Sequence, residues 1–155
     1  MEQRKKLMLV SSSGGHWEEL MCIRAVAQHH DAVYVTEEGG QAQDSGLQPL
    51  YTLPQINRRE KNFMPHLLKL YRRASRIVRD EKPDVLITTG ALLSVPFCYA
   101  AKRRGVKVVY IESFARVTDK SLSGKLVYPI ADLFLVQWES LLKLYPKARF
   151  VGGVF

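Results

Sequence analysis

The sequence predicts an α/β domain built on a mostly parallel sheet, and three observations lead to this fold class. Short apolar runs, such as residues 7–10 and 32–36, have the composition of strands buried on both faces. Longer stretches with apolar residues at helical spacing alternate with these runs. Small residues follow the first and fourth apolar runs, where a parallel strand turns into the next helix. Such alternation is typical of a parallel sheet joined by right-handed crossovers.

Length and composition fit one globular domain. The 155 residues, 46% hydrophobic and 25% charged, are enough for a real core, so we expect a single domain over residues 1–155. Cys22 and Cys98 lie in apolar helical stretches without metal-ligand spacing, which predicts two reduced core thiols in a cytosolic protein. No signal-peptide pattern is visible, and the longest nearly uncharged stretch, 91–101, is far shorter than the roughly 20 residues that span a bilayer. We therefore expect no helix of the chain to cross a membrane.

The first strand and helix are the clearest of the expected elements. Residues 7–10 are uniformly apolar, and the small residues 11–15 then allow a tight turn in which a ligand can approach the backbone. A helix is predicted over residues 17–30, with Glu18 and Glu19 in its first turn, where the helix macrodipole favours acids. This unit is the usual opening of a doubly wound α/β domain.

The middle of the chain contains two further strands and the longest helix. Strands are predicted at residues 32–36 and 50–53, and the charged residues 56–62 form a connector. Apolar residues at helical spacing predict a helix over residues 63–81, for which Asn62 is the expected N-cap.

The last part of the chain repeats the alternation with shorter elements. After a strand at residues 83–88, small residues form a second turn, and the following helix ends at Gly105. The remaining expected elements are a helix at 92–104, a strand at 106–112, a loop at 113–125, a helical turn at 126–130, a strand at 132–137, a short helix at 139–144 and a last strand at 149–152.

Three predicted strand ends carry residues suited to catalysis or to phosphate binding. Because the carboxyl ends of parallel strands meet at one sheet edge, we expect these turns to lie together at the switch point of the sheet. His16, at a helix N-terminus, would be kept neutral by the dipole and so able to accept a proton. Glu112 could orient that imidazole or bind a sugar hydroxyl. In the simpler alternative, His16 only caps the turn and Glu112 makes a structural hydrogen bond.

The net charge of +8 calls for an anionic partner, and the charge gathers around the helix at 63–81. A broad apolar surface at the start of this helix, surrounded by cations, suits insertion into an anionic membrane surface. Alternatively, the helix packs on the sheet and its arginines are simply solvated. Nucleic acid is not expected, since no groove-reading motif or aromatic platform accompanies the charge. The predicted membrane surface consists of Arg58, Arg59, Phe63, Met64, Leu67, Leu68 and Arg72.

Other chemistries have weaker support. The chain has no G-x-G-x-x-G motif, although Glu37 and Glu38 end the second strand, where a ribose-binding acid would lie. A stand-alone nucleotide-binding or NAD-type protein is therefore kept as an alternative. The sequence shows no His–Cys metal cluster and no carboxylate pair suited to a diphosphate-bound metal, so neither a metal nor another cofactor is expected.

Four sequence blocks together resemble one family of oligosaccharide-biosynthesis proteins. The blocks are SSSGGHWEEL, TTGALLSVP, VVYIESFARV and FVGGVF, and they extend over nearly the whole chain. The family comprises the membrane-recruiting subunit of the two-part N-acetylglucosaminyltransferase of dolichol-linked N-glycan assembly, and bacterial capsule and exopolysaccharide proteins of the PssD and CpsF type. A more distant similarity to the N-terminal half of the peptidoglycan transferase MurG rests on Gly14, Gly15, His16, Thr89, Gly90 and Glu112.

The resemblance implies a Rossmann-like domain equivalent to the N-terminal, acceptor-binding half of a GT-B glycosyltransferase. A separate subunit would bind the UDP-sugar, while this chain would bind the lipid-linked acceptor and the membrane. His16 would be the base that deprotonates the acceptor hydroxyl, and Glu112 a supporting residue of the acceptor site. The acceptor or its phosphates would be bound at Ser13, Gly14, Gly15, Thr89, Gly90 and Ser113, and the apolar tail, Val151, Gly152, Gly153, Val154 and Phe155, would dock the partner subunit.

Eukaryotic members of this family begin with a hydrophobic anchor helix, which this sequence does not show. We therefore expect a bacterial subunit, peripheral on the cytoplasmic face of the plasma membrane. It would belong to an inverting transferase that acts on an undecaprenyl-pyrophosphate-linked sugar in capsule or exopolysaccharide assembly. The transferred sugar stays open, and the chain is expected to be inactive alone. As an alternative, it is a non-catalytic scaffold that activates its partner.

Overall fold

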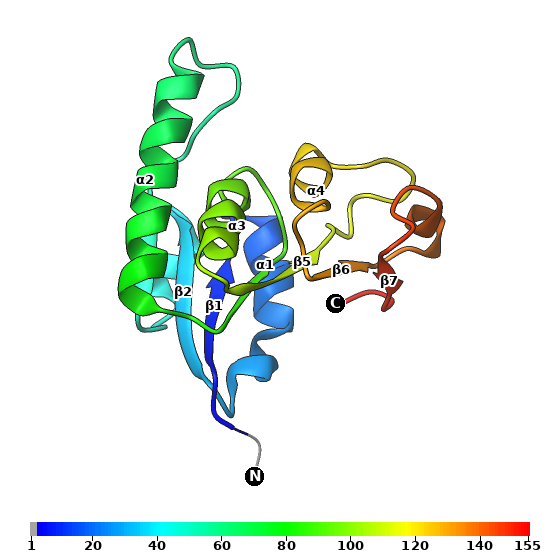
Figure 1. Cartoon of the computed structure of the whole chain (residues 1–155), viewed down its shortest axis with the longest axis horizontal. Helices are drawn as coiled ribbons and strands as arrows, with labels where there is room; N and C mark the ends of the chain where they lie inside the picture. The colour runs from blue at the N-terminus through cyan, green and yellow to red at the C-terminus, as the bar shows by residue number, and fades with distance from the viewer. Residues whose placement is uncertain (1–2) are drawn as a thin grey trace.

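The computed structural model describes residues 3–155 and contains one seven-stranded, all-parallel sheet in the order β3-β2-β1-β4-β5-β6-β7 (Figure 1). The predicted α/β fold class is confirmed, as are the seven predicted strands. The strand order reverses between β1 and β4, which is the switch point of the sheet. The strands are β1 (Lys6–Val10), β2 (Asp31–Glu37), β3 (Leu50–Leu53), β4 (Val85–Thr88), β5 (Lys107–Ile111), β6 (Leu133–Val136) and β7 (Arg149–Phe150).

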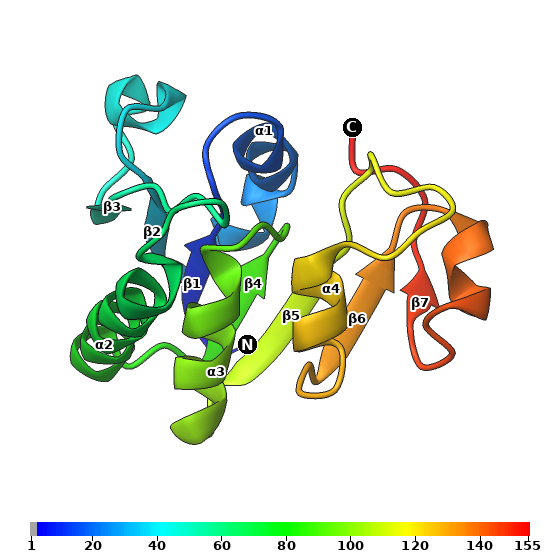
Figure 2. The same cartoon turned by 90° about the horizontal axis from the view of Figure 1, so that it is seen from above.

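Helices cover both faces of the sheet (Figure 2). One face carries α1 (Gly15–Cys22), and the other carries α2 (Phe63–Glu81), α3 (Ser94–Arg103) and α4 (Leu122–Val127). Three short 3-10 helices complete the described chain, at Arg24–Ala27, Gln41–Asp44 and Glu139–Lys143. This is the layered arrangement that an all-parallel sheet requires, because its strands must be buried on both sides.

Alternation along the strands divides the core into two parts. In β1, Leu7 and Leu9 belong to the core under α1, which also includes Trp17 and Leu20. Met8 and Val10 point to the other face, into the larger core of α2, α3 and α4. Residues of this second core from the helices include Leu70, Ala74, Phe97, Cys98 and Val127.

The long helix α2 is anchored at one end only. Its middle and C-terminal turns pack against the core through the buried side chains of Leu70, Ala74 and Val78. Its first turns project beyond the carboxyl edge of the sheet (Figure 1). At the anchored end, Lys6 Nζ donates to Glu81 at 2.6 Å, and the Tyr51 hydroxyl donates to the same carboxylate. The protruding end therefore lies on the same side of the molecule as the turns that follow β1 and β4.

Several predicted boundaries were wrong, each for a local reason. The helix predicted at 17–30 ends at Cys22, and the 3-10 helix Arg24–Ala27 then turns the chain back toward β2. This turn buries Ala27 and leaves Cys22 exposed, so only Cys98 is the core thiol that the sequence predicted for both. The predicted loop at 113–125 and helical turn at 126–130 are replaced by α4, because Ser121 caps a helix by accepting from Gly124 N at 2.9 Å.

Candidate functional site

A pocket of about 270 Å³ opens at the carboxyl edge of the sheet, where the turns after β1, β4 and β5 meet. The sequence predicted this convergence. The wall of the pocket combines one imidazole, two guanidinium groups, three hydroxyls and small apolar side chains, contributed by His16, Arg58, Ala91, Leu92, Ser113, Ala115, Arg116, Ser121, Leu122 and Ser123.

His16 is positioned by two turns at once. It lies in the first turn of α1, directly after Gly14 (φ 76°) and Gly15. The His16 Nδ1 atom lies 2.9 Å from the carbonyl oxygen of Thr89, and the Thr89 hydroxyl donates to the His16 carbonyl at 2.6 Å. Since a carbonyl can only accept, Nδ1 carries the hydrogen and a neutral ring has its free lone pair on Nε2. The ring is therefore set up as a proton acceptor through Nε2.

The turn after β4 is tight and lies under the imidazole. Gly90 has φ 102°, and a Cβ there would lie 2.8 Å from the Tyr110 hydroxyl and 3.7 Å from His16 Cε1. Ala91 also has a positive φ, of 71°, which is strained for a residue with a side chain. Such strain is often found at ligand sites, and Ala91 lines the pocket.

Glu112 is fully buried and lies beneath the pocket instead of on its wall. Its Oε1 accepts from Ser121 Oγ at 2.7 Å and from Ser113 N at 3.1 Å. Its Oε2 accepts from the Tyr145 hydroxyl at 2.7 Å and from Ser121 N at 3.3 Å. Burial and this hydrogen bond raise the pKa of Tyr145, which keeps the phenol as a donor. The Thr89 carbonyl orients His16, and the contacts of Glu112 fit the structural alternative.

A second buried carboxylate was missed in the sequence. Glu19 was expected only as a favourable charge at a helix start, yet it is 4% exposed. Its Oε1 accepts from Ser113 Oγ and Phe114 N, both at 3.1 Å, and its Oε2 from Gln137 Nε2 at 3.2 Å. Gln137 also donates to the Glu112 carbonyl at 3.0 Å and accepts from Val154 N at 3.0 Å. The network thus joins α1, the loop after β5 and the C-terminal tail.

Two arginines give the pocket its positive charge. Arg58 was predicted as part of the membrane surface, and the structure places it on the pocket wall. Arg116 lies in the loop after β5, where Asp119 pairs with its Nη1 at 2.7 Å. Sequence reasoning missed Arg116 because a loop residue carries no periodic signal.

Ser13 does not line the pocket, but it contacts Glu37, which lines a neighbouring hollow of about 480 Å³ that shares Arg58 and Leu92 with the pocket. Both its N–H and its hydroxyl donate to Glu37 Oε2, at 3.3 Å and 3.2 Å. Glu37 is therefore already engaged by the turn after β1, and Glu38 is exposed. Glu37, Gln55, Asn57 and Glu60 make this hollow rich in groups that bind hydroxyls.

The predicted membrane residues gather at the free end of α2. Met64 is 67% exposed and Leu68 52%, whereas Phe63 and Leu67 are half-buried. Met64, Leu67 and Leu68 line an apolar groove with Tyr71 of α2 and Tyr99 of α3. Further exposed apolar residues on the same layer of helices, which the sequence did not single out, are Tyr99, Leu122 and Leu126. In residues 3–155 no helix has both the length and the apolar character that crossing a membrane requires.

The C-terminal tail forms an aromatic patch with the loop after β5. The Phe155 ring lies 5.5 Å from that of Phe114, which lies 4.8 Å from Trp138. Phe150, Val151 and Phe155 are about half exposed or more. The described residues hold no group of three or more His, Cys, Asp or Glu side chains that would suit a metal ion.

The fold defines a class of domain, the α/β domain that also occurs in the glycosyltransferase MurG and in UDP-N-acetylglucosamine 2-epimerases. In fold, the chain is similar to MurG from Acinetobacter baumannii, with a TM-score of 0.79 and 17% identity over 96% of this chain. It is also similar to UDP-N-acetylglucosamine 2-epimerase from Rickettsia bellii, with a TM-score of 0.75 and 18% identity over 98% of this chain. The chain covers 46% of each of those two proteins.

Sequence comparison then identifies the family. Residues 59–154 match the model described as "Oligosaccharide biosynthesis protein Alg14 like", and the chain belongs to this family. The UDP-N-acetylglucosamine transferase subunit ALG14 of Yarrowia lipolytica is 28% identical, over 95% of this chain and 80% of that protein. The mouse subunit is 28% identical over 96% of this chain and 82% of its own length. The Schizosaccharomyces pombe subunit is 48% identical over 46% of this chain and 37% of its own length.

Proposed function

We propose that this chain is the acceptor-binding subunit of a two-subunit, inverting UDP-sugar transferase that acts on a polyprenyl-pyrophosphate-linked sugar. The observation that carries the proposal is the hydrogen bond from His16 Nδ1 to Thr89 O, which leaves Nε2 as the free base of a cationic pocket. The names of the related subunits make UDP-N-acetylglucosamine the first donor to test. The proposed setting is bacterial capsule or exopolysaccharide assembly, with an undecaprenyl carrier.

In the proposed reaction, His16 Nε2 accepts the proton of the acceptor hydroxyl as its oxygen attacks the anomeric carbon of the donor. The bond from that carbon to the UDP oxygen breaks with inversion, and UDP leaves with the electron pair. The donor would be held by the partner subunit, since this chain corresponds to about half of a MurG chain.

The acceptor's pyrophosphate has three partners in this pocket. Arg58 and Arg116 line it, and the first N–H groups of α1 have no partner inside the helix. One guanidinium group can donate two parallel hydrogen bonds to two oxygens of a phosphate. The N-terminus of a helix adds a dipole that favours the anion. Gly14, Gly15 and Gly90 keep side chains out of this approach, while Glu112 and Ser113 hold the loop from beneath.

Two exposed surfaces would attach the subunit to its surroundings. The aromatic patch of the tail, together with residues 151–155, is the proposed docking site for the donor-binding partner, since large apolar patches mark interfaces. The free end of α2 is the proposed membrane contact, on the cytoplasmic face of the plasma membrane. Because that end projects beyond the carboxyl edge of the sheet, it would bring the pocket to the lipid-linked acceptor (Figure 1).

The test is a transferase assay with undecaprenyl-pyrophosphate-linked sugar and a panel of UDP-sugars. It is run with this chain alone, with the candidate donor-binding partner alone, and with both. Turnover that requires both, or that this chain raises strongly, is the expected result. Turnover by this chain alone would contradict the two-subunit proposal.

A second function is favoured by the buried network itself. Glu19, Glu112 and Gln137 serve structural hydrogen bonds, and His16 joins the turns after β1 and β4. These contacts also suit a scaffold that shapes the partner's site without proton transfer. Replacement of His16, described in the Discussion, separates the two functions.

A further inference from the structure

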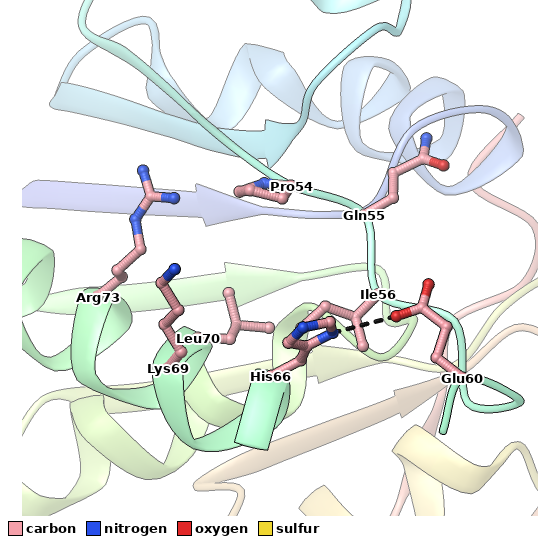
Figure 3. Close-up of a pocket in the computed structure, with 8 residues that line it drawn as sticks. All are labelled: Pro54, Gln55, Ile56, Glu60, His66, Lys69, Leu70 and Arg73. Atoms are coloured by element: carbon pink, nitrogen blue, oxygen red, sulfur yellow. Dashed lines mark hydrogen bonds and ion pairs between the residues drawn. The ribbon is translucent and has the colours of Figure 1, made fainter. Parts of the chain in front are cut away.

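A hollow of about 330 Å³ lies between α2 and the segment that follows β3, away from His16 (Figure 3). Its apolar part consists of Pro54, Ile56 and Leu70. Its basic residues, His66, Lys69 and Arg73, come from successive turns on one face of α2, and Gln55 and Glu60 complete its polar lining. The side chains of Lys69 and Arg73 rise from α2 on the same side, toward Pro54 (Figure 3).

The charges around this hollow are not balanced. Glu60 is its one acidic lining residue, and Glu60 Oε2 lies 3.1 Å from His66 Nδ1. Within residues 3–155 neither Lys69 nor Arg73 forms an ion pair, although they are four residues apart on one helix. Like charges at this spacing repel each other, so an anion bound between them would be stabilised by both. Arg73 can bind two oxygens of a phosphate through its planar fork, with Lys69 as a point charge beside it.

The residues next to the hollow indicate which phosphate-bearing molecule it would bind. Met64 and Leu68, the exposed apolar residues at the free end of α2, lie within a turn and a half of Lys69. At 1.5 Å rise per residue, Lys69 is about 7.5 Å along the helix from Met64. The free end of α2 projects from the molecule and would enter the head-group region end-on (Figure 1). With Met64 buried about 5–10 Å below the head-group boundary, Lys69 would lie at the level of the phosphates, and Arg73, about 13.5 Å along the helix from Met64, would lie just on their aqueous side.

We propose that this hollow, the Lys69/Arg73 site, binds the phosphate of an anionic membrane lipid. The inference rests on the proposed membrane docking of α2 and goes beyond it. It makes the attachment a defined site for one head group instead of a diffuse attraction between the basic chain and the membrane. The bound lipid would fix the depth and the rotation of α2, and with them the distance of the pocket of His16 from the bilayer.

The experiment compares two charge-matched double variants of the full chain in vesicle co-flotation. Lys69→Gln/Arg73→Gln removes the proposed site, and Arg76→Gln/Arg79→Gln removes two exposed charges of the same helix outside the hollow. Vesicles contain phosphatidylcholine alone or with phosphatidylglycerol. With phosphatidylglycerol, we expect the first variant to bind roughly tenfold to thirtyfold more weakly than the parent, and the second less than about threefold more weakly. Thermal unfolding, unchanged in both variants, shows that the fold is intact.

Each other outcome overturns a defined part of the argument. Equal losses in the two variants mean diffuse attraction and overturn the site. Binding that is independent of phosphatidylglycerol overturns the anionic ligand, and no binding of the parent to either vesicle overturns the membrane docking itself. Titration with inorganic phosphate, followed by amide NMR shifts at residues 54–56 and 66–73, identifies the source. Shifts that depend on Lys69 and Arg73, combined with unchanged vesicle binding, would mean a site for a soluble phosphate and overturn the lipid.

Discussion

Two regions of this molecule invert the usual distribution of polar and apolar side chains, in opposite directions. Beneath the pocket, Glu19, Glu112 and Gln137 are buried, and hydrogen bonds hold each of them. At the free end of α2, the apolar Met64 and Leu68 are exposed. A buried polar network in which every group is hydrogen-bonded holds its side chains in one geometry. An exposed apolar surface is instead suited to binding a partner or a membrane. The first region has the fixed geometry that the proposed chemistry requires, and the second has the exposed apolar surface that the proposed membrane attachment requires.

The largest expected effect tests whether the rigid region performs chemistry. His16→Ala in the assembled two-subunit complex should lower kcat by roughly 10²–10⁴-fold, the usual contribution of a general base. Turnover with saturating acceptor and UDP-sugar measures it. His29→Ala, which removes an exposed histidine outside both regions, is the matched control and should leave kcat unchanged. Normal turnover by His16→Ala would favour the scaffold function.

Removing a carboxylate from the buried network should cost the fold most. Glu112→Ala leaves Ser113 N, Ser121 N and the Tyr145 hydroxyl without their acceptor, which should lower the free energy of unfolding by about 3 kcal/mol. Urea denaturation measures the change. Glu38→Ala, at an exposed position, should change it by less than about 0.5 kcal/mol. Similar free energies of unfolding for the two variants would mean that the hydrogen bonds of Glu112 do not stabilise the fold.

The link between the network and the tail should show in a smaller effect. Gln137→Leu removes the donor to Glu19 and the acceptor of Val154 N, so about 2 kcal/mol of stability should be lost. The amides of residues 151–155 should also exchange faster with solvent, since Val154 is released. Hydrogen exchange followed by mass spectrometry checks this, and unchanged exchange in the tail would separate the tail from the network.

The anchored end of α2 offers a pH test of the contrast between its two ends. Hydrogen bonds from Lys6 and Tyr51 hold the pKa of Glu81 below its usual value of 4.5. The carboxylate therefore stabilises the fold at neutral pH, and this contribution is lost as the pH falls from about 4.5 through the lower, folded pKa. Glu81→Gln should cost about 1 kcal/mol at pH 7, and the difference from the parent should shrink below pH 4.5. Thermal unfolding across pH, with the exposed Asp80→Asn as control, measures it.

The free end of α2 should contribute least to stability. Met64→Gln and Leu68→Gln together should change the free energy of unfolding by less than about 1 kcal/mol, because both side chains are mostly in water. Binding to anionic vesicles should nevertheless fall about tenfold, since each side chain loses apolar burial in the interface. Val26→Gln, equally exposed but outside α2, should leave vesicle binding unchanged. A large loss of stability would show that this end belongs to the core.

Local sequence patterns determined the sheet and the places where its strands end. Uniformly apolar runs such as 7–10 can be satisfied only by burial on both faces, so the parallel sheet and the meeting of His16 with Thr89 followed from topology. The tertiary structure alone decided that Glu112 lies beneath the pocket, that Arg58 and Arg116 line it, and that Glu19 is buried. These outcomes depend on partners up to 118 residues away in the chain, as in the pair Glu19 and Gln137. The sequence shows a glutamate in the same way whether its carboxylate is hydrogen-bonded to water or to a distant amide. Only the packed structure distinguishes an exposed glutamate from a buried, hydrogen-bonded one.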